Sequence, residues 1–203
     1  MFVQVISAEV KDIDGVASAR QRWETELMPG ADGFLGSTGG VTPDGRMILA
    51  ARFESEEAAA RNSERPEQGE WWSSLERHLN GPATFFESSD VTVSGDGGSD
   101  DAGFVQIVKG RTNDIEAGKE LDRRMEKEMA GQRPDVLGSF TAVRPDGEFY
   151  AVIYFTSHEE EARQAEKQMT ENPSPLADEW ARLMEGEMVF YDLEAPWLVS
   201  PAR

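Results

Sequence analysis

Three polar side chains lie in otherwise apolar, strand-like rows and are the first candidates for ligand contact. Arg52 ends one such row, and Tyr150 and Tyr154 lie in another. A buried polar group needs a partner or a ligand, so Arg52 could hold an anionic oxygen and the tyrosines could donate a proton. The alternatives are a salt bridge from Arg52 to one of the many carboxylates, and core packing of both tyrosines with a satisfied hydroxyl.

A second group of candidates lies in a segment with helical spacing. It contains Asn62, Trp71, Trp72 and His78. Trp71 and His78 are seven residues apart, which places them on one helix face about two turns apart. The alternative interpretation is that Asn62 is solvated, Trp72 belongs to the core and His78 is a surface side chain. The second half of the chain keeps only Trp180 in this region.

No established catalytic motif accompanies these residues. The sequence lacks a His-Glu-x-x-His motif, a Walker loop and a nucleophile elbow. It has no cysteine and two histidines, His78 and His158. A metal site built on thiolates is therefore excluded, and we expect neither a bound metal nor a cofactor.

The elements that position these candidates are repeated along the chain. Four sequence matches recur at a constant offset of 102 residues, with Phe2-Val3-Gln4-Val5-Ile6 answered by Phe104-Val105-Gln106-Ile107-Val108, Asp12-Ile13 by Asp114-Ile115, Leu35-Gly36-Ser37 by Leu137-Gly138-Ser139, and Pro43-Asp44-Gly45 by Pro145-Asp146-Gly147. A period near 100 residues is long enough for a domain. The chain is thus predicted to be a pseudo-dimer on one polypeptide, with repeat 1 at 1–92, a Gly/Asp/Ser-rich linker at 93–103 and repeat 2 at 104–203.

Each repeat reads as strand, helix, strand, strand, helix, strand. This order predicts an α+β fold of two tandem ferredoxin-like (βαββαβ) repeats. Thr42-Pro43-Asp44-Gly45 predicts a hairpin between strands near 33–42 and 46–54. Both rows of the third strand are largely apolar, so the face not covered by helices needs a second partner, and the sister repeat is the obvious one. We expect the two open faces to meet and enclose interior pockets.

Composition limits the partners. The formal net charge is −19, so the chain lacks the basic footprint needed to bind nucleic acid. No apolar run reaches the roughly 18 residues of a membrane span, and the N-terminus lacks a basic region followed by an apolar segment. We expect a cytoplasmic protein that contacts neither nucleic acid nor membrane.

The paired split βαβ units, with a Pro-Asp-Gly hairpin in each and a tryptophan in the second helix, resemble the dimeric α/β-barrel superfamily, particularly its antibiotic-biosynthesis-monooxygenase-like group. The resemblance implies an intramolecular dimeric α/β barrel. In cofactor-free oxygenases of the group, Asn, Trp and Tyr surround a substrate that itself supplies electrons to oxygen. Carried over, this would make Asn62, Trp72 and His78 catalytic and Arg52, Trp71, Tyr150 and Tyr154 ligand-binding, with an asparagine amide stabilising an enolate-like oxygen.

Haem-degrading relatives in the same group use an Asn near the first strand, a Trp and a second-helix His. Here Ser7 and Lys109 stand where that Asn is expected, and the spacing from Trp72 to His78 is shorter than in that group. The sequence therefore argues against haem. The function expected is a cofactor-independent monooxygenase or related isomerase acting on a small aromatic or polyketide-like molecule. The alternative is a non-catalytic small-ligand-binding protein or structural pseudo-dimer.

Overall fold

The computed structural model describes residues 1–203 except 96, 130–132, 134, 157–174 and 202–203, so His158 lies outside the described residues. The chain divides into two compact units. Unit 1 comprises Met1–Ser89 with Trp197–Arg203, and unit 2 comprises Asp90–Pro196. Each unit holds one five-stranded antiparallel sheet among its described residues.

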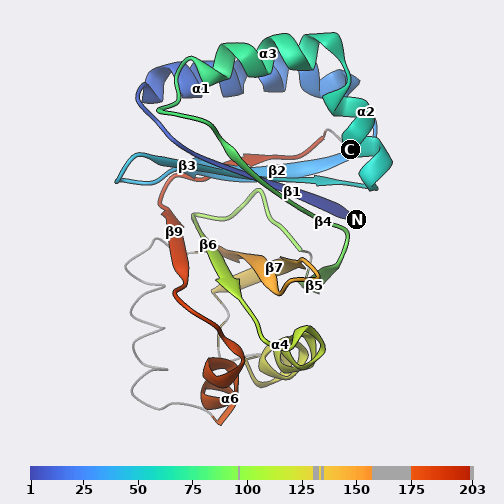
Figure 1. The fold of residues 1–203 in the computed structure, drawn as a ribbon, viewed down its shortest axis with the longest axis vertical. Helices are drawn as coiled ribbons and strands as arrows, with labels where there is room; N and C mark the ends of the chain where they lie inside the picture. The colour runs from blue at the N-terminus through green and yellow to red at the C-terminus, as the bar shows by residue number, and fades with distance from the viewer. Residues whose placement is uncertain (96, 130–132, 134, 157–174, 202–203) are drawn as a thin grey trace. The chain divides into compact units, whose positions relative to one another are not determined.

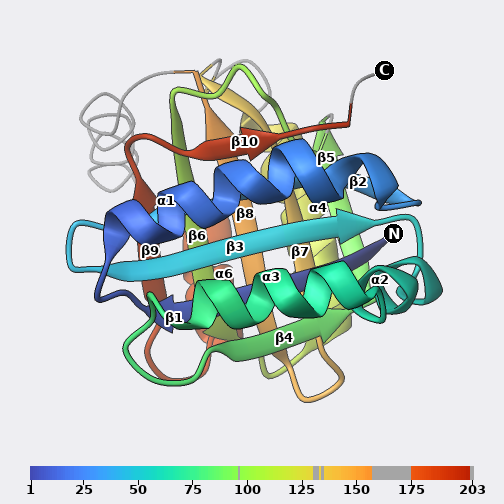
Figure 2. The same ribbon diagram turned by 90° about the horizontal axis from the view of Figure 1, so that it is seen from above.

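In unit 1 the sheet has the strand order β10-β2-β3-β1-β4, and the helices lie on one of its faces (Figure 1). Seen from above, α1 and α3 run side by side, roughly along the direction of β3 (Figure 2). The elements are β1 (Phe2–Glu9), α1 (Ile13–Arg22), a π-helical turn (Trp23–Leu27), a 3₁₀ turn (Met28–Gly30), β2 (Phe34–Val41), β3 (Arg46–Phe53), α2 (Glu56–Ser63), α3 (Pro66–Glu76), β4 (Thr84–Ser88) and β10 (Trp197–Val199).

Local chemistry explains where these elements begin and end. Asp12 and Ser55 accept hydrogen bonds from the backbone N–H groups at the starts of α1 and α2, as N-caps do. Pro66 opens α3, where its missing N–H costs nothing, and so divides the second helix of the repeat in two. Gly45 takes φ 83° in the predicted hairpin between β2 and β3.

Both faces of the unit 1 sheet are apolar, as the sequence predicts. On the helix side, the strands supply buried side chains to two core clusters that also include residues of α1, α2 and α3. On the other side, Val3, Val5, Ile48 and Ala50 form a second buried row. Because successive residues alternate between faces, Phe2, Gln4 and Ile6 face the helices while Val3 and Val5 face away.

Unit 2 repeats the plan, with the strand order β5-β7-β8-β6-β9. Gly147, with φ 84°, takes the place of Gly45 in its hairpin. The described elements are β5 (Val91–Gly95), β6 (Phe104–Arg111), α4 (Ile115–Met129), β7 (Val136–Val143), β8 (Glu148–Phe155), α6 (Pro175–Leu183) and β9 (Val189–Leu193). The prediction of an α+β fold with tandem ferredoxin-like repeats is confirmed.

The division between units differs from the predicted repeats at two places. Residues 91–95, assigned in part to the linker, form β5 and pair with β7 of unit 2. Residues 197–199, assigned to repeat 2, form β10 and pair with β2 of unit 1. Each sheet thus gains an edge strand from a segment that lies next to the other repeat in sequence.

Candidate functional site

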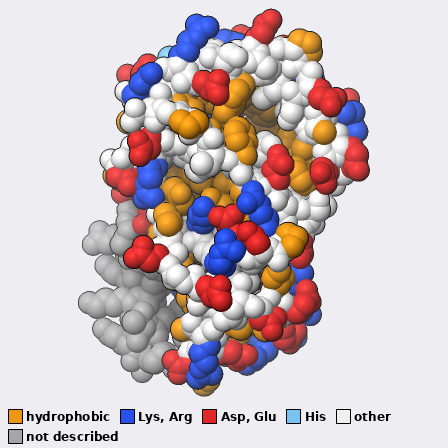
Figure 3. Space-filling view, in the orientation of Figure 1, with side chains coloured by type: hydrophobic (Ala, Val, Ile, Leu, Met, Phe, Trp, Pro, Cys, Tyr) orange, Lys and Arg blue, Asp and Glu red, His pale blue; other side chains and the backbone are white. Residues whose placement is uncertain are grey.

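Trp72 and Phe85 form an aromatic pair at the surface of unit 1. Their ring centroids are 5.3 Å apart, and 47% of Phe85 is exposed. Trp72 is half-buried on α3 and packs against the core, whereas Phe85 lies on β4 at one edge of the sheet. Figure 3 shows hydrophobic side chains at the surface of this unit, in a hollow between its helices and its sheet. The pair therefore offers an apolar surface to a flat ligand.

A polar pair lies beside these rings on the same side of the sheet. Gln4 on β1 is directly opposite Glu87 on β4, and its Nε2 donates to Glu87 Oε1 at 2.6 Å. The neighbouring cross-strand pair is Ile6 with Phe85, so the carboxylate and the aromatic ring are two residues apart on β4. The amide fixes the orientation of the carboxylate, which is a proton acceptor when ionised.

Trp71 is a core residue. Its side chain is 6% exposed, and its indole Nε1 donates to the backbone oxygen of Ala19 on α1 at 2.7 Å. Its ring lies between that of Trp72, 6.1 Å away, and that of Trp23, 6.4 Å away. Trp71 thus joins α3 to α1 and supports the Trp72 ring from behind.

Asn62 and His78 are held at opposite ends of α3. Asn62, 7% exposed on α2, accepts a hydrogen bond from Arg65 Nη1 at 3.0 Å. His78 follows α3, and its Nδ1 lies 2.8 Å from Asp12 Oδ2. The backbone hydrogen bond from Gly15 and the contact with His78 together lower the pKa of Asp12. The 11 residues of α3 span about 16 Å, so the structure does not bring Asn62 and His78 together.

Arg52 lies on the face of the unit 1 sheet that turns away from the helices. It pairs with Gly36 on β2, and a Cβ atom at Gly36 would come within 2.8 Å of Arg52 Nη2. The same Cβ would meet the backbone oxygen of Val199 at 2.9 Å. Glycine at 36, with φ 141°, thus leaves room for the guanidinium and the C-terminal strand.

Tyr150 and Tyr154 lie on the corresponding face of the unit 2 sheet, and both are buried. The Tyr154 ring packs 6.4 Å from that of Phe140. Lys109, opposite Tyr150 on β6, lies 5.7 Å from the Tyr150 ring and 2.9 Å from Glu148. Burial raises the pKa of Tyr150, and the Glu148 hydrogen bond raises that of Lys109, so both keep their protons at neutral pH.

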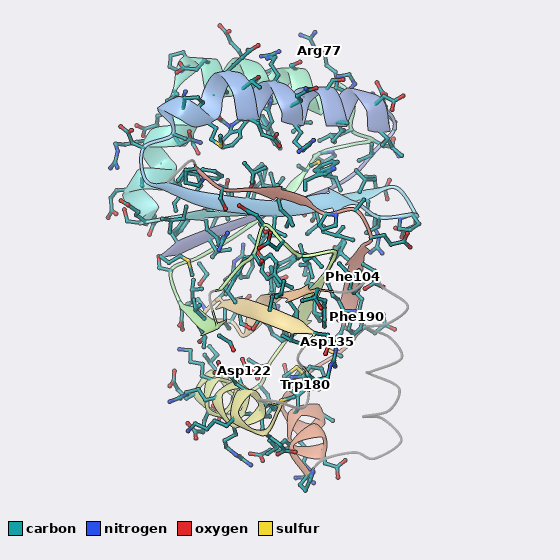
Figure 4. The ribbon with its side chains drawn as sticks, turned by 180° about the vertical axis from the view of Figure 1, so that it is seen from behind. Arg77, Phe104, Asp122, Asp135, Trp180 and Phe190 are labelled. Carbon is teal, nitrogen blue, oxygen red and sulfur yellow. The ribbon has the colours of Figure 1, made fainter. Side chains whose placement is uncertain are left out.

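Unit 2 has an equivalent polar pair, but its aromatic side chains are placed differently from the Trp72–Phe85 pair. Gln106 Nε2 donates to Asp192 Oδ1 at 2.9 Å, and Phe190 is 45% exposed. The helix register differs, because Lys11 N donates to His78 O whereas Asn113 N donates to Leu183 O. Leu183 therefore takes the place of His78, and by the same spacing Leu176 takes that of Trp71. Trp180, which Figure 4 shows on α6 with Phe190 on β9, matches neither tryptophan of α3.

Phe85 and Glu87 are not among the site residues predicted from the sequence. A pattern repeated in both halves could have indicated them. Gln4 and Gln106 interrupt the apolar first strands, and in both closing strands a phenylalanine lies two positions before an acidic residue. The described residues contain no group of three or more His, Cys, Asp or Glu placed to hold a metal ion. None of the described helices is both long enough and apolar enough to cross a membrane.

Comparison with known proteins supports the fold over the whole chain. No family model and no curated protein matches the sequence. Among solved structures, a "putative monooxygenase" from Lactobacillus acidophilus aligns with 98% of this chain and 95% of its own at TM-score 0.71 and 10% identity. A "Putative monooxygenase" from Fusobacterium nucleatum aligns with 98% of this chain and 94% of its own, at TM-score 0.72 and 12% identity.

A third structure, an anthrone oxidase-like protein, covers 100% of this chain and 96% of its own at TM-score 0.66 and 7% identity. At these identities the likeness shows the fold alone. The predicted resemblance to antibiotic-biosynthesis-monooxygenase-like proteins is thus confirmed at the level of fold.

Proposed function

We propose that this chain, a protein with a monooxygenase-like fold, binds a small aromatic molecule on Trp72 and Phe85 of unit 1 and oxidises it with molecular oxygen, without a bound metal or cofactor. The observation that carries the proposal is the half-exposed Phe85 ring, tilted against the Trp72 ring at a centroid distance of 5.3 Å, beside a carboxylate that Gln4 holds in place. An aromatic pair at the surface, rimmed by polar groups, is typical of a ligand site. The full-length likeness to proteins described as monooxygenases supports the reaction class.

The residues of this site suit a substrate that supplies its own electrons. Glu87 would remove a proton from an activated C–H group, with Gln4 holding the carboxylate in place. The resulting enolate would reduce oxygen. For an anthrone, one oxygen atom forms the new carbonyl group of the anthraquinone and the other leaves as water, so anthrone and O₂ give anthraquinone and water.

The other predicted residues enter this proposal in different ways. Trp71 supports the ring of Trp72, to which the proposal gives the role of an aromatic surface for the substrate; the predicted catalytic role of Trp72 stays a prediction. Asn62 and His78 lie at the two ends of α3, and Arg52, Tyr150 and Tyr154 lie on faces turned away from the helices. Their predicted roles stay predictions, and the proposed reaction does not use them.

Haem is not part of the proposal. The Ser7 hydroxyl, at the position of the expected Asn, lies 2.7 Å from the Thr84 hydroxyl and therefore belongs to the β1–β4 ladder. His78 Nδ1 is engaged by Asp12. We infer that the residues present do not fit a haem site.

The test is an anthrone oxidation assay with the purified chain, without added metal or cofactor. We expect oxygen uptake together with anthraquinone absorbance. Phe85→Ala and Trp72→Ala should each lower kcat/KM by up to about tenfold, because an aromatic contact is worth roughly 0.5–1.5 kcal/mol beyond its buried area. Glu87→Gln should lower kcat with little change in KM. Ile13→Ala, which removes an exposed apolar side chain elsewhere in unit 1, is the control and should leave both constants unchanged.

Three results would each contradict a part of this proposal. If anthrone binds in a titration and Phe85→Ala weakens that binding, but no oxygen is consumed, the chain is a non-catalytic binding protein at the same site. If Phe85→Ala, Trp72→Ala and Glu87→Gln all oxidise anthrone as fast as the wild type, the reaction does not occur on Trp72 and Phe85. Adding haemin is expected to change no rate, and a haemin-dependent rate would contradict the cofactor-free proposal.

A further inference from the structure

The opposite edge of the unit 1 sheet carries a buried hydrogen-bond donor. Arg20, on α1, places its Nε where it is buried and has no acceptor among the residues that the structure describes. Buried donors are almost always satisfied in native proteins, so an unsatisfied one calls for an explanation. A ligand oxygen is one such explanation, because it would supply the acceptor.

An aromatic ring covers the same guanidinium. The Arg20 Cζ lies 5.3 Å from the centroid of the Trp197 ring. Trp197 opens β10, a strand of three residues that pairs with β2 and forms the edge of the sheet opposite β4. A short edge strand opens at low cost, so the ring could turn aside and then pack on an entering molecule.

The charges around Arg20 favour an uncharged ligand. Arg20 Nη1 is 2.5 Å from Glu24 Oε1, an i,i+4 pair that balances the positive charge. Beside the indole, the Nε–H group is the buried donor of this guanidinium that lacks an acceptor among the described residues. Such a group suits the carbonyl oxygen of a neutral aromatic molecule better than a carboxylate, which Glu24 would repel.

Unit 2 does not repeat this arrangement. The residue 102 positions after Arg20 is Asp122, which is an acceptor when ionised. The corresponding edge strand of unit 2 is β5. Its Thr92 pairs with Thr141, which corresponds to Gly39, so Thr92 takes the place that Trp197 has in unit 1. The donor and its aromatic cover therefore belong to unit 1 alone.

We propose that Arg20 Nε and the Trp197 ring form a second binding site in unit 1, specific for a small, uncharged aromatic ketone. Nε donates to the ketone oxygen, and the ligand ring packs on Trp197. The site lies at the β10 edge of the sheet, whereas Phe85 lies at the β4 edge, and it does not depend on the proposed oxidation.

The test uses 4-hydroxyacetophenone as the probe and 4-ethylphenol, which lacks the ketone oxygen, as the matched ligand. The arginine Nε–H signals of the ¹⁵N-labelled full chain are followed by NMR during titration. We expect one signal, absent in Arg20→Lys, to shift with the ketone and not with the phenol. The Kd for the ketone should rise about tenfold in Arg20→Lys, the loss expected for one hydrogen bond to a charged donor.

Arg22→Lys is the matched control, because Arg22 forms an equivalent i,i+4 pair with Glu26 on the same helix without this cover. It should leave the Kd unchanged. Trp197→Leu retains the Arg20 signal and should weaken ketone binding severalfold. The proposal is overturned if ketone and phenol bind equally, if neither shifts the Arg20 signal, or if Arg20→Lys binds the ketone as the wild type does. A shift that persists in Phe85→Ala separates this site from the proposed oxidation site.

Discussion

Folding raises the pKa of the Asp122 carboxyl group through a single cause. It is partly buried on α4, and burial is the cause that raises the pKa of its carboxyl group above the ordinary value of 3.8. The folded chain therefore holds this proton more tightly than the unfolded chain does. Stability from this group is present below the unfolded pKa and is lost as the pH rises through the folded pKa.

This gives a prediction for Asp122→Asn. The amide avoids the cost of a buried carboxylate, so the variant should be more stable than the wild type at pH 7, by about 1 kcal/mol. The difference should shrink as the pH falls towards 3, where Asp122 is protonated in both states. Denaturant unfolding at several pH values measures this, with Glu126→Gln, an exposed neighbour on α4, as the control. An equal gain at pH 3 and pH 7 would contradict the explanation.

At the scale of elements, glycine has opposite roles in β2 and α3. A Cβ atom on Gly39 would lie 2.5 Å from the backbone oxygen of Ile48 on the adjacent strand, whereas a Cβ on Gly69 would meet nothing within 4 Å. A glycine inside a strand can leave room for a ligand, mark a bulge or allow close approach of another backbone. At Gly39 the missing side chain lets two backbones approach.

We therefore expect the same substitution to act in opposite directions at these positions. Gly39→Ala should destabilise the chain by roughly 1–3 kcal/mol through overpacking. Gly69→Ala should stabilise it by up to about 1 kcal/mol, because alanine restricts the unfolded chain and suits an exposed helix. Thermal unfolding of both variants checks the pair. A stable Gly39→Ala protein would mean that β2 and β3 can separate there.

At the scale of the whole molecule, the chain returns to unit 1 after unit 2 is complete. Trp197 and Val199 each contribute to the helix-side clusters of unit 1, and β10 pairs with β2. Unit 1 therefore includes residues that lie about 110 positions beyond the end of β4 in the sequence. The sheet of unit 1 is completed by residues 197–199.

Deleting residues 197–203 should weaken unit 1 selectively. Hydrogen exchange should lose protection in β2 by about tenfold or more, because this strand becomes a free edge. The strands β6 and β8 should keep theirs, since their pairing lies within unit 2. Deletion of residues 200–203 is the control and should leave β2 protected. Equal loss in both units would show that their stabilities are coupled.

The sequence by itself determined the duplication, the order of elements and the two Pro-Asp-Gly hairpins. These features rest on local signals, namely alternating strands, capping side chains and turn glycines, which act within a few residues. It also identified Trp72 as a residue of interest. The buried position of Trp71 was within reach too, since the same helical stripe contains Leu75.

Only the tertiary structure decided which side chains meet. Phe85 reaches Trp72 because β4 pairs with β1, 80 residues earlier, and Arg20 meets Trp197 because β10 adds to β2. Asn62 and His78 are separated because α3 is straight between them. The repeat offset also grows from 102 at Val10 and Thr112 to 105 at Leu79 and Met184, so that Trp180 corresponds to Leu75 and to neither tryptophan of α3. Such pairings depend on contacts between distant segments, and local periodicity carries no information about them.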